Sequence, residues 1–561
     1  MRVIRRVFSK IPDVILLIVL FYFCLLPIVG VIGYGITANA GQLTKDSIVR
    51  ILGLLANSLK LSGAVTLISV MLATAAAFTV YRLRFPGRRI LWVLMLLPLV
   101  NPSFVGSLSF IMLFGTRGLI THKLLGLSIS PFGWHGIMFL QVMGLTTIAY
   151  LIISGSIRST NVDLEDAARN LGASEPYILT HITLPMMLPE ITVAALLVFL
   201  ASMADFSTPV VIGGNFHTLA SDLYIQIIGV YDMKMASITG IVLLVPCFMA
   251  FVIQNKIANK KKFGHDGASG RNIVYGNCPR PIRAAMITLT LVQVCLFTLI
   301  FVFIFVGAFT KSWGYDYSFT LSHAAEVFSK GFRTYLKPLS NSVVLSLVTG
   351  VVTAALGTML AYWVHQKKIL SAKLVDIMCL LPAAVPGILF GIGYLVTFKH
   401  SLFGIGEYIF PSSPKIILLG TTVIIYLVCV ARQMNLSMKS CYALLDHIDP
   451  DIMNASYNLG ASKGYAAVRI LIPMLKDAFM NAFLRIFSST MSTLGAIVFL
   501  ILPKNKVIIQ ILFQIISSNS MGTSCFIALL LSGTTLAVML LFYTGAYGRN
   551  ILYMYRRRGS V

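Results

Sequence analysis

The chain has 561 residues, of which 57% are apolar and 11% are charged, and its mean hydropathy is +0.87. So few polar residues cannot cover the surface of soluble domains or keep a disordered chain solvated, and the composition also excludes a collagen or a secreted disulfide scaffold. We therefore expect a polytopic membrane protein that has the lipid bilayer as its main solvent. The net charge of +25 would suggest a nucleic-acid partner in a soluble protein, but here the placement of the charges matters more, and no nucleic-acid partner is expected.

Twelve apolar stretches have the roughly 20 residues needed to cross a hydrocarbon core. Because a backbone in lipid must satisfy its own hydrogen bonds, each stretch is expected to be a helix. The first stretch follows a basic N-terminal segment, but it is longer than a signal-peptide core and has no clear cleavage site, so we interpret it as a retained span. The predicted spans are 13–36, 58–81, 90–114, 135–156, 190–212, 236–255, 284–309, 342–364, 374–398, 415–436, 479–502 and 523–546.

The distribution of Lys and Arg predicts the orientation. When the N-terminus is placed in the cytoplasm, the inner segments carry 29 of these residues and the outer segments carry 14. Such an excess on one side is typical of cytoplasmic loops. We expect a multi-pass protein of the inner or plasma membrane with both termini in the cytoplasm.

Cysteine and histidine give no sign of a metal site. The eight Cys residues contain no CxxC pair and mostly fall within apolar runs, which favours small buried side chains over disulfides. No two of the nine His residues have metal-ligand spacing. No activated nucleophile or paired acid and base can be argued either, so the sequence predicts no catalytic residue, no metal and no enzyme.

The sequence contains one internal repeat. The first half has the anchors Asn57-Ser58, Leu97-Pro98 and Pro102, and these return 284 residues later as Asn341-Ser342, Leu381-Pro382 and Pro386. Six spans in each copy is an even number, so the copies are parallel. We predict a first half at 1–255, a basic cytoplasmic linker at 256–283 and a second half at 284–561.

A cytoplasmic loop at 161–189, between the fourth and fifth predicted spans, carries the most informative pattern. Asn161 is suited to cap a short helix, and Gly172 is suited to end it. Ser174 is expected to cap a second short helix that runs to Pro185. The first turns of the first helix carry carboxylates, which the exposed amides of a helix start favour: Asp163, Glu165 and Asp166. We predict a rigid knob that transmits force from a soluble partner to the membrane helices.

This loop resembles the EAA motif of permease subunits of binding-protein-dependent ABC importers, in which Glu-Ala-Ala is followed by Gly and then by Ile-x-Leu-Pro. The matching residues are Glu165, Asp166, Ala167, Ala168, Gly172, Ile182, Leu184 and Pro185. A second copy at 449–477 has the same spacing but an amide in place of the acid: Asn454, Ala455, Ser456, Gly460, Ile470, Ile472 and Pro473. Met453 stands where the first copy has Glu165, so the resemblance implies two ATPase-coupling loops that dock unequally.

The resemblance covers both halves and implies the all-α fold of a type I ABC importer permease, with about twelve transmembrane helices in two parallel, pseudo-symmetric six-helix halves. It also implies two partners: a cytoplasmic ABC ATPase dimer, whose closure rocks the halves between inward- and outward-facing states, and an extracytoplasmic solute-binding protein. The chain has no Gly-x-x-x-x-Gly-Lys-Ser/Thr phosphate loop. ATP is therefore expected to bind a partner subunit, and no cofactor is expected in this chain.

Two charged residues within predicted spans are candidates for the translocation path, because charge is costly in lipid. Asp205 lies in the fifth span and Arg485 in the eleventh, and Ser207 and Thr208 add hydroxyls near Asp205. Two interpretations are open. Either these residues line the path and help to select a polar or anionic solute, or each charge is satisfied by a polar neighbour or reaches an interface.

The solute follows only from resemblance. A single chain with both copies, and the stretch at 205–214, resemble ferric-iron-type fused permeases, which makes ferric iron the first choice. Phosphonate, sugar-phosphate and thiamine transport are the alternatives within the same machinery. The rival class is a gradient-driven secondary transporter, which usually places more carboxylates within its spans.

Overall fold

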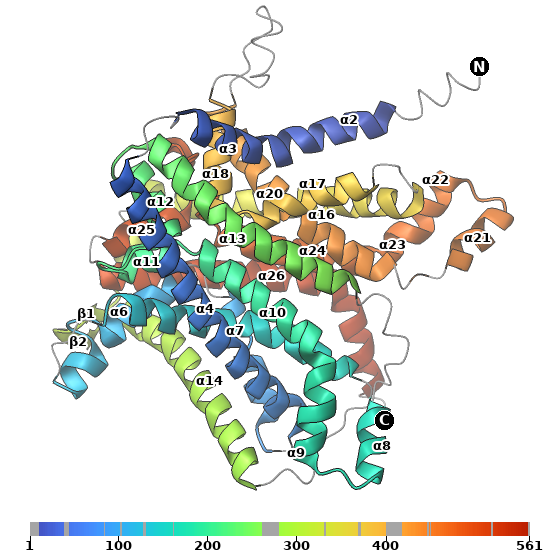
Figure 1. Ribbon diagram of the computed structural model, residues 1–561, viewed down its shortest axis with the longest axis horizontal. Helices are drawn as coiled ribbons and strands as arrows, with labels where there is room; N and C mark the ends of the chain where they lie inside the picture. Colours follow the sequence, from blue (N-terminus) through green and yellow to red (C-terminus); the bar gives the residue numbers. More distant parts are fainter. Residues whose placement is uncertain are drawn as a thin grey trace, which may run out of the picture. The chain divides into compact units, whose positions relative to one another are not determined.

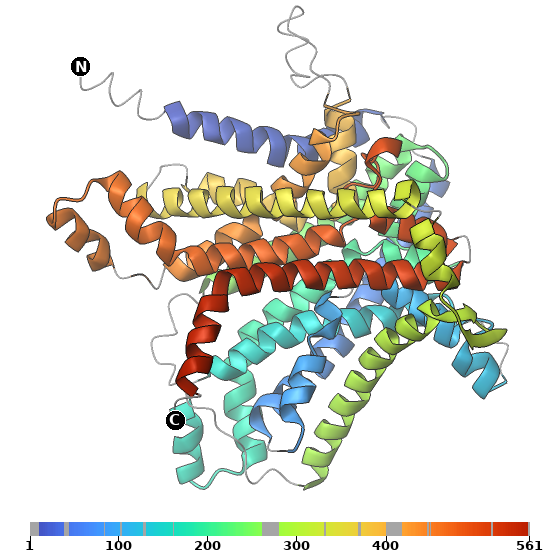
Figure 2. The same cartoon turned by 180° about the vertical axis from the view of Figure 1, so that it is seen from behind.

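Figures 1 and 2 show the computed structural model from opposite sides. Helices dominate the described residues, which confirms the expected all-helical membrane fold. The strands described are β1 (Thr310–Ser312) and β2 (Asp316–Phe319), which form one antiparallel pair. The structure describes residues 11–38, 44–83, 85–100, 104–126, 131–160, 162–260, 280–329, 332–367, 372–399, 418–445, 448, 450–517 and 520–558. Most of the predicted linker at 256–283 lies outside them.

The chain packs as two compact units. Unit 1 contains residues 1–37, 327–512 and 530–561, and unit 2 contains residues 38–326 and 513–529. The first apolar segment, α2 (Ile11–Leu20), η1 (Phe21–Leu25) and α3 (Leu26–Ala38), packs with unit 1 up to Thr37, whereas α14 (Arg280–Ala308) packs with unit 2. Packing units and sequence halves therefore differ in these segments, and the halves defined by the repeat stay a prediction.

Unit 2 is built around three helices that pack on one another: α4 (Lys45–Arg82), α7 (Trp134–Ser159) and α10 (Leu184–Ala204). Their apolar side chains surround Tyr150 and Ile153 in a continuous core. This burial of apolar surface also joins α14 to α4. The remaining elements of the unit are α5 (Arg88–Leu94), η2 (Leu97–Val100), α6 (Val105–Phe114), η3 (Leu119–Leu124), α8 (Val162–Asn170), α9 (Glu175–Ile178), η4 (Leu179–Thr183), α11 (Ser207–Ile212), α12 (Leu219–Ile228), α13 (Met233–Lys260) and most of α15 (Ser322–Ser329).

Unit 1 has a similar trio: α16 (Lys337–Lys367), α20 (Val423–Leu445) and α24 (Lys476–Met491) pack on one another. Beside them, α17 (Ala372–Ala384) packs on α20 and on η1. The other elements of this unit, with the last two extending into unit 2, are η6 (Phe332–Leu336), α18 (Gly387–Thr397), α21 (Pro450–Asn458), α22 (Lys463–Ala466), η7 (Ala467–Leu471), α23 (Ile472–Met474), η8 (Pro503–Asn505), α25 (Ile508–Ser517) and α26 (Met521–Arg558).

Eight helices in the described parts of the chain are long and apolar enough to cross a membrane, and a ninth span results if the bent pair α17 and α18 is counted as one. That pair bends by 110°, at the position of Pro386. The predicted span 90–114 is divided into α5, η2 and α6, and Phe104 at its second break has a φ of 74°. In the predicted span 479–502, helix α24 ends at Met491. The total of twelve stays a prediction.

Both copies of the predicted Asn-Ser anchor make the same hydrogen bonds within their own units. Asn57 Nδ2 donates to the His217 carbonyl at 3.3 Å, and Asn341 Nδ2 donates to the Lys506 carbonyl at 3.0 Å. The partner serines act on the starts of short helices. Ser58 Oγ accepts from Leu219 N–H, the first residue of α12, and Ser342 Oγ accepts from Ile508 N–H, the first of α25, both at 2.9 Å. Each buried serine thus satisfies an amide that its own helix leaves without a partner.

Most cysteines behave as predicted. Six of the seven cysteines in the described regions are buried, as expected of small apolar side chains, whereas Cys295 is exposed. Cys278 lies outside the described residues.

We predict that Ser58→Ala and Ser342→Ala each lower the stability of the folded chain by about 1–3 kcal/mol, because each leaves a buried amide without an acceptor. Thermal unfolding of the purified protein in lipid nanodiscs measures the loss. Thr192→Val is the matched control, since that exposed hydroxyl donates only to the Leu188 carbonyl of its own helix. Loss at one serine with none at the other would contradict the equivalence of the two anchors.

Candidate functional site

The first predicted knob has the expected helix–glycine–helix form. Helix α8 ends at Asn170, Gly172 has a φ of 88°, and α9 begins at Glu175. The N–H of Ala173 donates to the Ala168 carbonyl at 3.0 Å, the pattern of a left-handed helix end. Ser174 has the extended backbone of a cap, but its hydroxyl makes no capping bond, which differs from the prediction. The predicted cap Asn161 lies outside the described residues.

The second knob repeats this corner. Helix α21 begins at Pro450, a residue suited to the first position of a helix, and Gly460 has a φ of 87°. The N–H of Ala461 donates to the Ser456 carbonyl at 3.0 Å, the same bond 288 residues further along the chain. A positive φ disfavours any residue with a side chain, so both corners depend on glycine.

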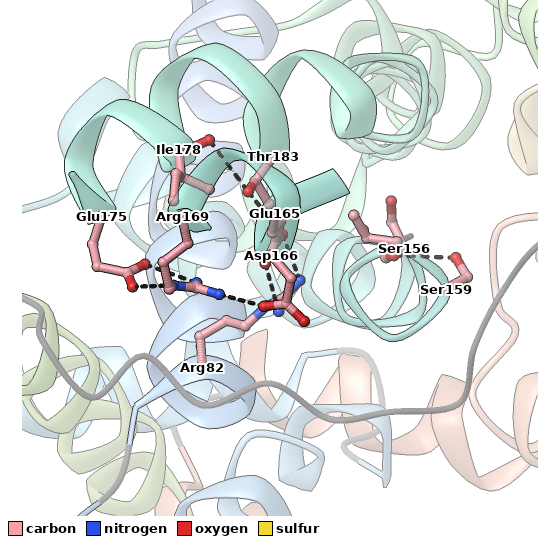
Figure 3. Close-up of polar contacts among 10 residues, drawn as sticks. Arg82, Ser156, Ser159, Glu165, Asp166, Arg169, Glu175, Ile178 and Thr183 are labelled. Atoms are coloured by element: carbon pink, nitrogen blue, oxygen red, sulfur yellow. Dashed lines mark hydrogen bonds and ion pairs between the residues drawn. The ribbon is translucent and has the colours of Figure 1, made fainter. Parts of the chain in front are cut away.

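The two copies share the glycine corner but not the acid of the motif. Glu165 of the first copy is completely buried. Its carboxylate forms a bidentate ion pair with Arg82 at the end of α4, with Nη1–Oε2 at 3.1 Å and Nη2–Oε1 at 3.0 Å. Thr183 Oγ1 donates to Oε1 at 2.9 Å (Figure 3). Parallel bonds of this kind are short, directional and strong. The residue therefore fastens the knob to α4, and its carboxylate is not an exposed contact.

Met453 occupies the equivalent position of the second knob and is 5% exposed. The second copy thus fills the same buried position with an apolar side chain. A buried ion pair and well-packed apolar side chains often have similar net stability, because charges lose their hydration on burial. The absence of the acid at Met453 therefore changes how this knob is held and does not by itself remove a surface charge.

Arg169 links the two helices of the first knob across the glycine corner. Its Nε donates to Glu175 Oε1 at 2.8 Å, and its Nη1 donates to Asp166 Oδ1 (Figure 3). The hydrogen bond to Glu175 raises the pKa of Arg169, so the clamp stays charged. Asp166 is 49% exposed, which makes it the acidic residue of the motif that solvent and a partner can reach.

Three of the large apolar side chains that each knob exposes recur at matched positions, and the sequence analysis did not single them out. In the first knob they are Leu164 (51% exposed), Leu171 (88%) and Tyr177 (52%), and in the second they are Ile452 (41%), Leu459 (89%) and Tyr465 (59%). Each residue of the second trio lies 288 positions after its counterpart. We call each trio a knob face. The repeat offset was the signal that could have identified them, because an apolar residue kept in an exposed loop of both copies has no packing role there.

The other predicted coupling residues lie on or next to these knobs. In the first copy Ala167 and Pro185 are exposed, whereas Ala168, Ile182 and Leu184 are partly buried along the path from α8 to α10. In the second copy Asn454, Ala455, Ile472 and Pro473 are exposed, Ile470 is partly buried and Ser456 is buried. Within each unit the structure thus brings these residues together in one loop. The cytoplasmic location of the loops and their action on a partner stay predictions.

Asp205 has a structural role in the break between α10 and α11. Its Oδ1 accepts from the Ser207 N–H at 2.9 Å, the Ser207 hydroxyl at 2.7 Å and the Thr208 N–H at 3.2 Å. Its Oδ2 accepts from Gln141 Nε2 at 3.0 Å. The carboxylate therefore caps α11 and is satisfied by polar neighbours, one of the two interpretations above.

Arg485 differs, since it lies exposed on α24. Arg485 belongs to unit 1 and Asp205 to unit 2, so each is described within its own unit. No group of three His, Cys, Asp or Glu residues arranged to hold a metal occurs in the parts of the chain that the structure describes.

We predict that Glu165→Gln lowers stability by about 3–5 kcal/mol, because Arg82 keeps a buried charge that has lost its counter-ion. Asp166→Asn is the control and should cost less than about 1 kcal/mol, since its ion pair is largely exposed. The double variant Arg82→Met/Glu165→Met should recover most of the loss, because it copies the apolar solution of Met453. Thermal unfolding and protease sensitivity of the loop measure these effects, and equal losses at Glu165 and Asp166 would refute the buried anchor.

Comparisons with known proteins agree with this architecture. The chain is 28% identical over 541 residues to the "Ferric transport system permease protein FbpB" of Actinobacillus pleuropneumoniae, covering 94% of this chain and 77% of that protein. It is 29% identical to the "Putative ferric transport system permease protein FbpB 1" of Haemophilus influenzae, covering 83% and 72%. It is also 31% identical over 174 residues to the "Molybdenum transport system permease protein ModB" of Escherichia coli, covering 30% of this chain and 76% of that protein.

Residues 65–263 match the family described as "Binding-protein-dependent transport system inner membrane component". This range contains α7 and α10, two of the three helices around which unit 2 is built, and the first knob between them. The family match and the relatives agree with the EAA resemblance seen in the sequence. The chain belongs to this family of inner-membrane permeases of ABC transporters, which are transport subunits and not enzymes.

Proposed function

We propose that this chain is a fused type I permease, with two parallel six-helix halves at 1–255 and 284–561 joined by the linker at 256–283. Twelve helices and two cytoplasmic termini complete this arrangement. The proposal is supported by features that recur in both copies: the serine-capped helices α12 and α25, the glycine corners, and the matched knob faces.

The coupling function is supported best by the two knob faces. Leu171 is 88% exposed and its counterpart Leu459 is 89% exposed. Contact of these apolar side chains with water is unfavourable, and a partner that covers them lowers the free energy. We propose that each face docks into a groove of one ATPase subunit. ATP is proposed to bind to these subunits and not to this chain. The Glu165 anchor and the Arg169 clamp then pass the movement of that subunit to α4 and α10.

Docking is proposed to be similar in apolar contact and unequal in charge. Both faces offer two aliphatic side chains and one tyrosine. Beside them the first knob has the half-exposed carboxylate of Asp166, whereas the second has the exposed amide of Asn454. The expected asymmetry therefore rests on Asp166, and not on the buried Glu165.

We predict that Leu171→Asp or Leu459→Asp reduces ATPase-subunit binding about tenfold or more, because a carboxylate replaces the most exposed apolar contact of the interface. The measurement is co-purification and titration of the permease with its ATPase in nanodiscs. Asn170→Asp and Asn458→Asp are matched controls that add the same charge at exposed neighbouring positions. Retained binding in both leucine variants would rule out the knob faces as docking surfaces.

Ferric iron is the proposed solute, delivered by an extracytoplasmic binding protein. Two relatives that cover 94% and 83% of this chain are described as ferric transport permeases, which supports iron over other solutes. The molybdenum relative covers only 30% of the chain. Phosphonate, sugar phosphate and thiamine are the alternative solutes. Asp205, Ser207, Thr208 and Arg485 are proposed to lie along the path, with Asp205 shaping it by capping α11.

We predict that proteoliposomes containing the chain, its ATPase and its binding protein take up labelled ferric iron only when ATP is present. Competition by excess phosphonate, sugar phosphate or thiamine should leave this uptake unchanged. Uptake driven by a proton or sodium gradient without ATP would support the secondary-transporter class instead. The control is Gly172→Pro together with Gly460→Pro, which removes both corners and should abolish ATP-driven uptake.

A further inference from the structure

A partly buried arginine, Arg432, lies in the middle of α20. Arg432 Nη1 is shielded from solvent and has no hydrogen-bond partner among the described residues. Its neighbours on either side are accounted for: Ala431 is buried in the core, and Gln433 donates to Thr490 Oγ1 at 2.7 Å. A guanidinium has five N–H donors and no acceptor, so leaving one of its nitrogens unbonded in a protein interior is costly.

The guanidinium lies against the start of α18. The nearest atoms to a Cβ built on Gly387, the first residue of α18, belong to the Arg432 guanidinium, whose Cζ lies 2.9 Å from that Cβ. A Cβ at this position would have to displace the guanidinium. Helix α18 packs on α20 and follows the 110° bend, so the two groups meet inside unit 1.

The start of α18 also has unused donors. Pro386 occupies the cap position and provides no side-chain hydrogen bond. The N–H groups of Gly387, Ile388 and Leu389 have no acceptor within the helix, because the bonding pattern begins at the fifth residue. All three residues are buried. Water therefore has little access to these amides.

These two features have the same electrostatic sign. The first turn of a helix carries a partial positive charge, and the guanidinium carries a full one. Placed together without an acceptor they repel each other, and the low dielectric of the interior strengthens that repulsion. A negatively charged group between them removes both problems, since helix starts and arginines are the two groups in proteins that bind oxyanions best.

We propose that Arg432 and the first turn of α18 form an oxyanion site, which accepts a carboxylate or phosphate oxygen. The identity of the cargo in this inference rests on the proposed transport function. If the cargo is ferric iron, this site repels the bare trivalent cation and favours a complex of iron with an oxyanion ligand.

The test uses the full-length chain in nanodiscs, without ATPase or binding protein, and measures equilibrium binding of citrate and of inorganic phosphate. The wild type should bind at least one of these probes. Arg432→Met should weaken that binding about tenfold to a hundredfold, the range expected for loss of a charge-assisted hydrogen bond. Arg432→Lys should bind with intermediate affinity, because it keeps the charge and loses the planar fork.

Lys373→Met is the matched control, since it removes one positive charge from an exposed position of α17 in the same unit and should leave binding unchanged. Gly387→Ala gives a second route, because its Cβ displaces the guanidinium from the amides and should weaken binding as Arg432→Met does. Thermal unfolding of each variant separates loss of the site from loss of the fold. Binding that is absent in the wild type, or equal in wild type and Arg432→Met, overturns the proposal.

Ferric citrate as a third probe distinguishes the source of the oxyanion. Tighter binding of the iron complex than of free citrate assigns the site to the cargo, and equal or weaker binding assigns it to a free anion. In either case, binding of the anion should be weaker in Arg432→Met than in the wild type. Because these measurements need no ATP-driven uptake, failure of the oxyanion site is distinguishable from failure of the transport function.

Discussion

The buried ion pair between Glu165 and Arg82 is the constraint on which the first knob depends. A short helix joined to the membrane domain through a glycine corner would by itself be a hinge, because glycine restricts the backbone least. Two parallel hydrogen bonds from Arg82 fix its base to α4, a helix of 38 residues, and the Thr183 hydroxyl fixes it to η4. Arg169 then fixes one side of the corner to the other. Movement imposed on the tip must therefore move the long helix as well.

The second knob reaches the same shape by different chemistry, which separates what the corner requires from what the anchor requires. Both copies need a left-handed residue, because the backbone bonds that end α8 and α21 form only there, and both have glycine. The anchor only has to fill a buried position, so Met453 replaces Glu165. The acid of the motif is consequently a poor guide to surface charge, whereas the exposed leucines at the corner recur in both copies.

The sequence predicted the features that depend on local chemistry. Gly172 and Gly460 ended helices as expected, and the Asn-Ser anchors marked equivalent positions. The predictions failed where the partner is distant in the sequence. Arg82 follows the predicted span 58–81 and was therefore included among the charges of the inner segments. In the structure it forms an ion pair with Glu165, 83 positions later. Hydropathy also placed the tenth span at 415–436, which put Arg432 near a helix end, whereas α20 covers Val423–Leu445 and Arg432 is central.

Asp205 and Arg432 show why composition alone could not rank the charged residues in the spans. Asp205 was conspicuous in the sequence, but the turn that it caps and Gln141 from α7 supply donors to both of its oxygens. Arg432 was inconspicuous, but it faces a helix start that has only donors to offer. In a low-dielectric interior a charge whose partners are supplied by the fold stabilises the structure, and a charge without such partners retains its capacity to bind. Selectivity in this permease is therefore expected where hydrogen bonds are incomplete, and that property depends on which elements the fold brings together.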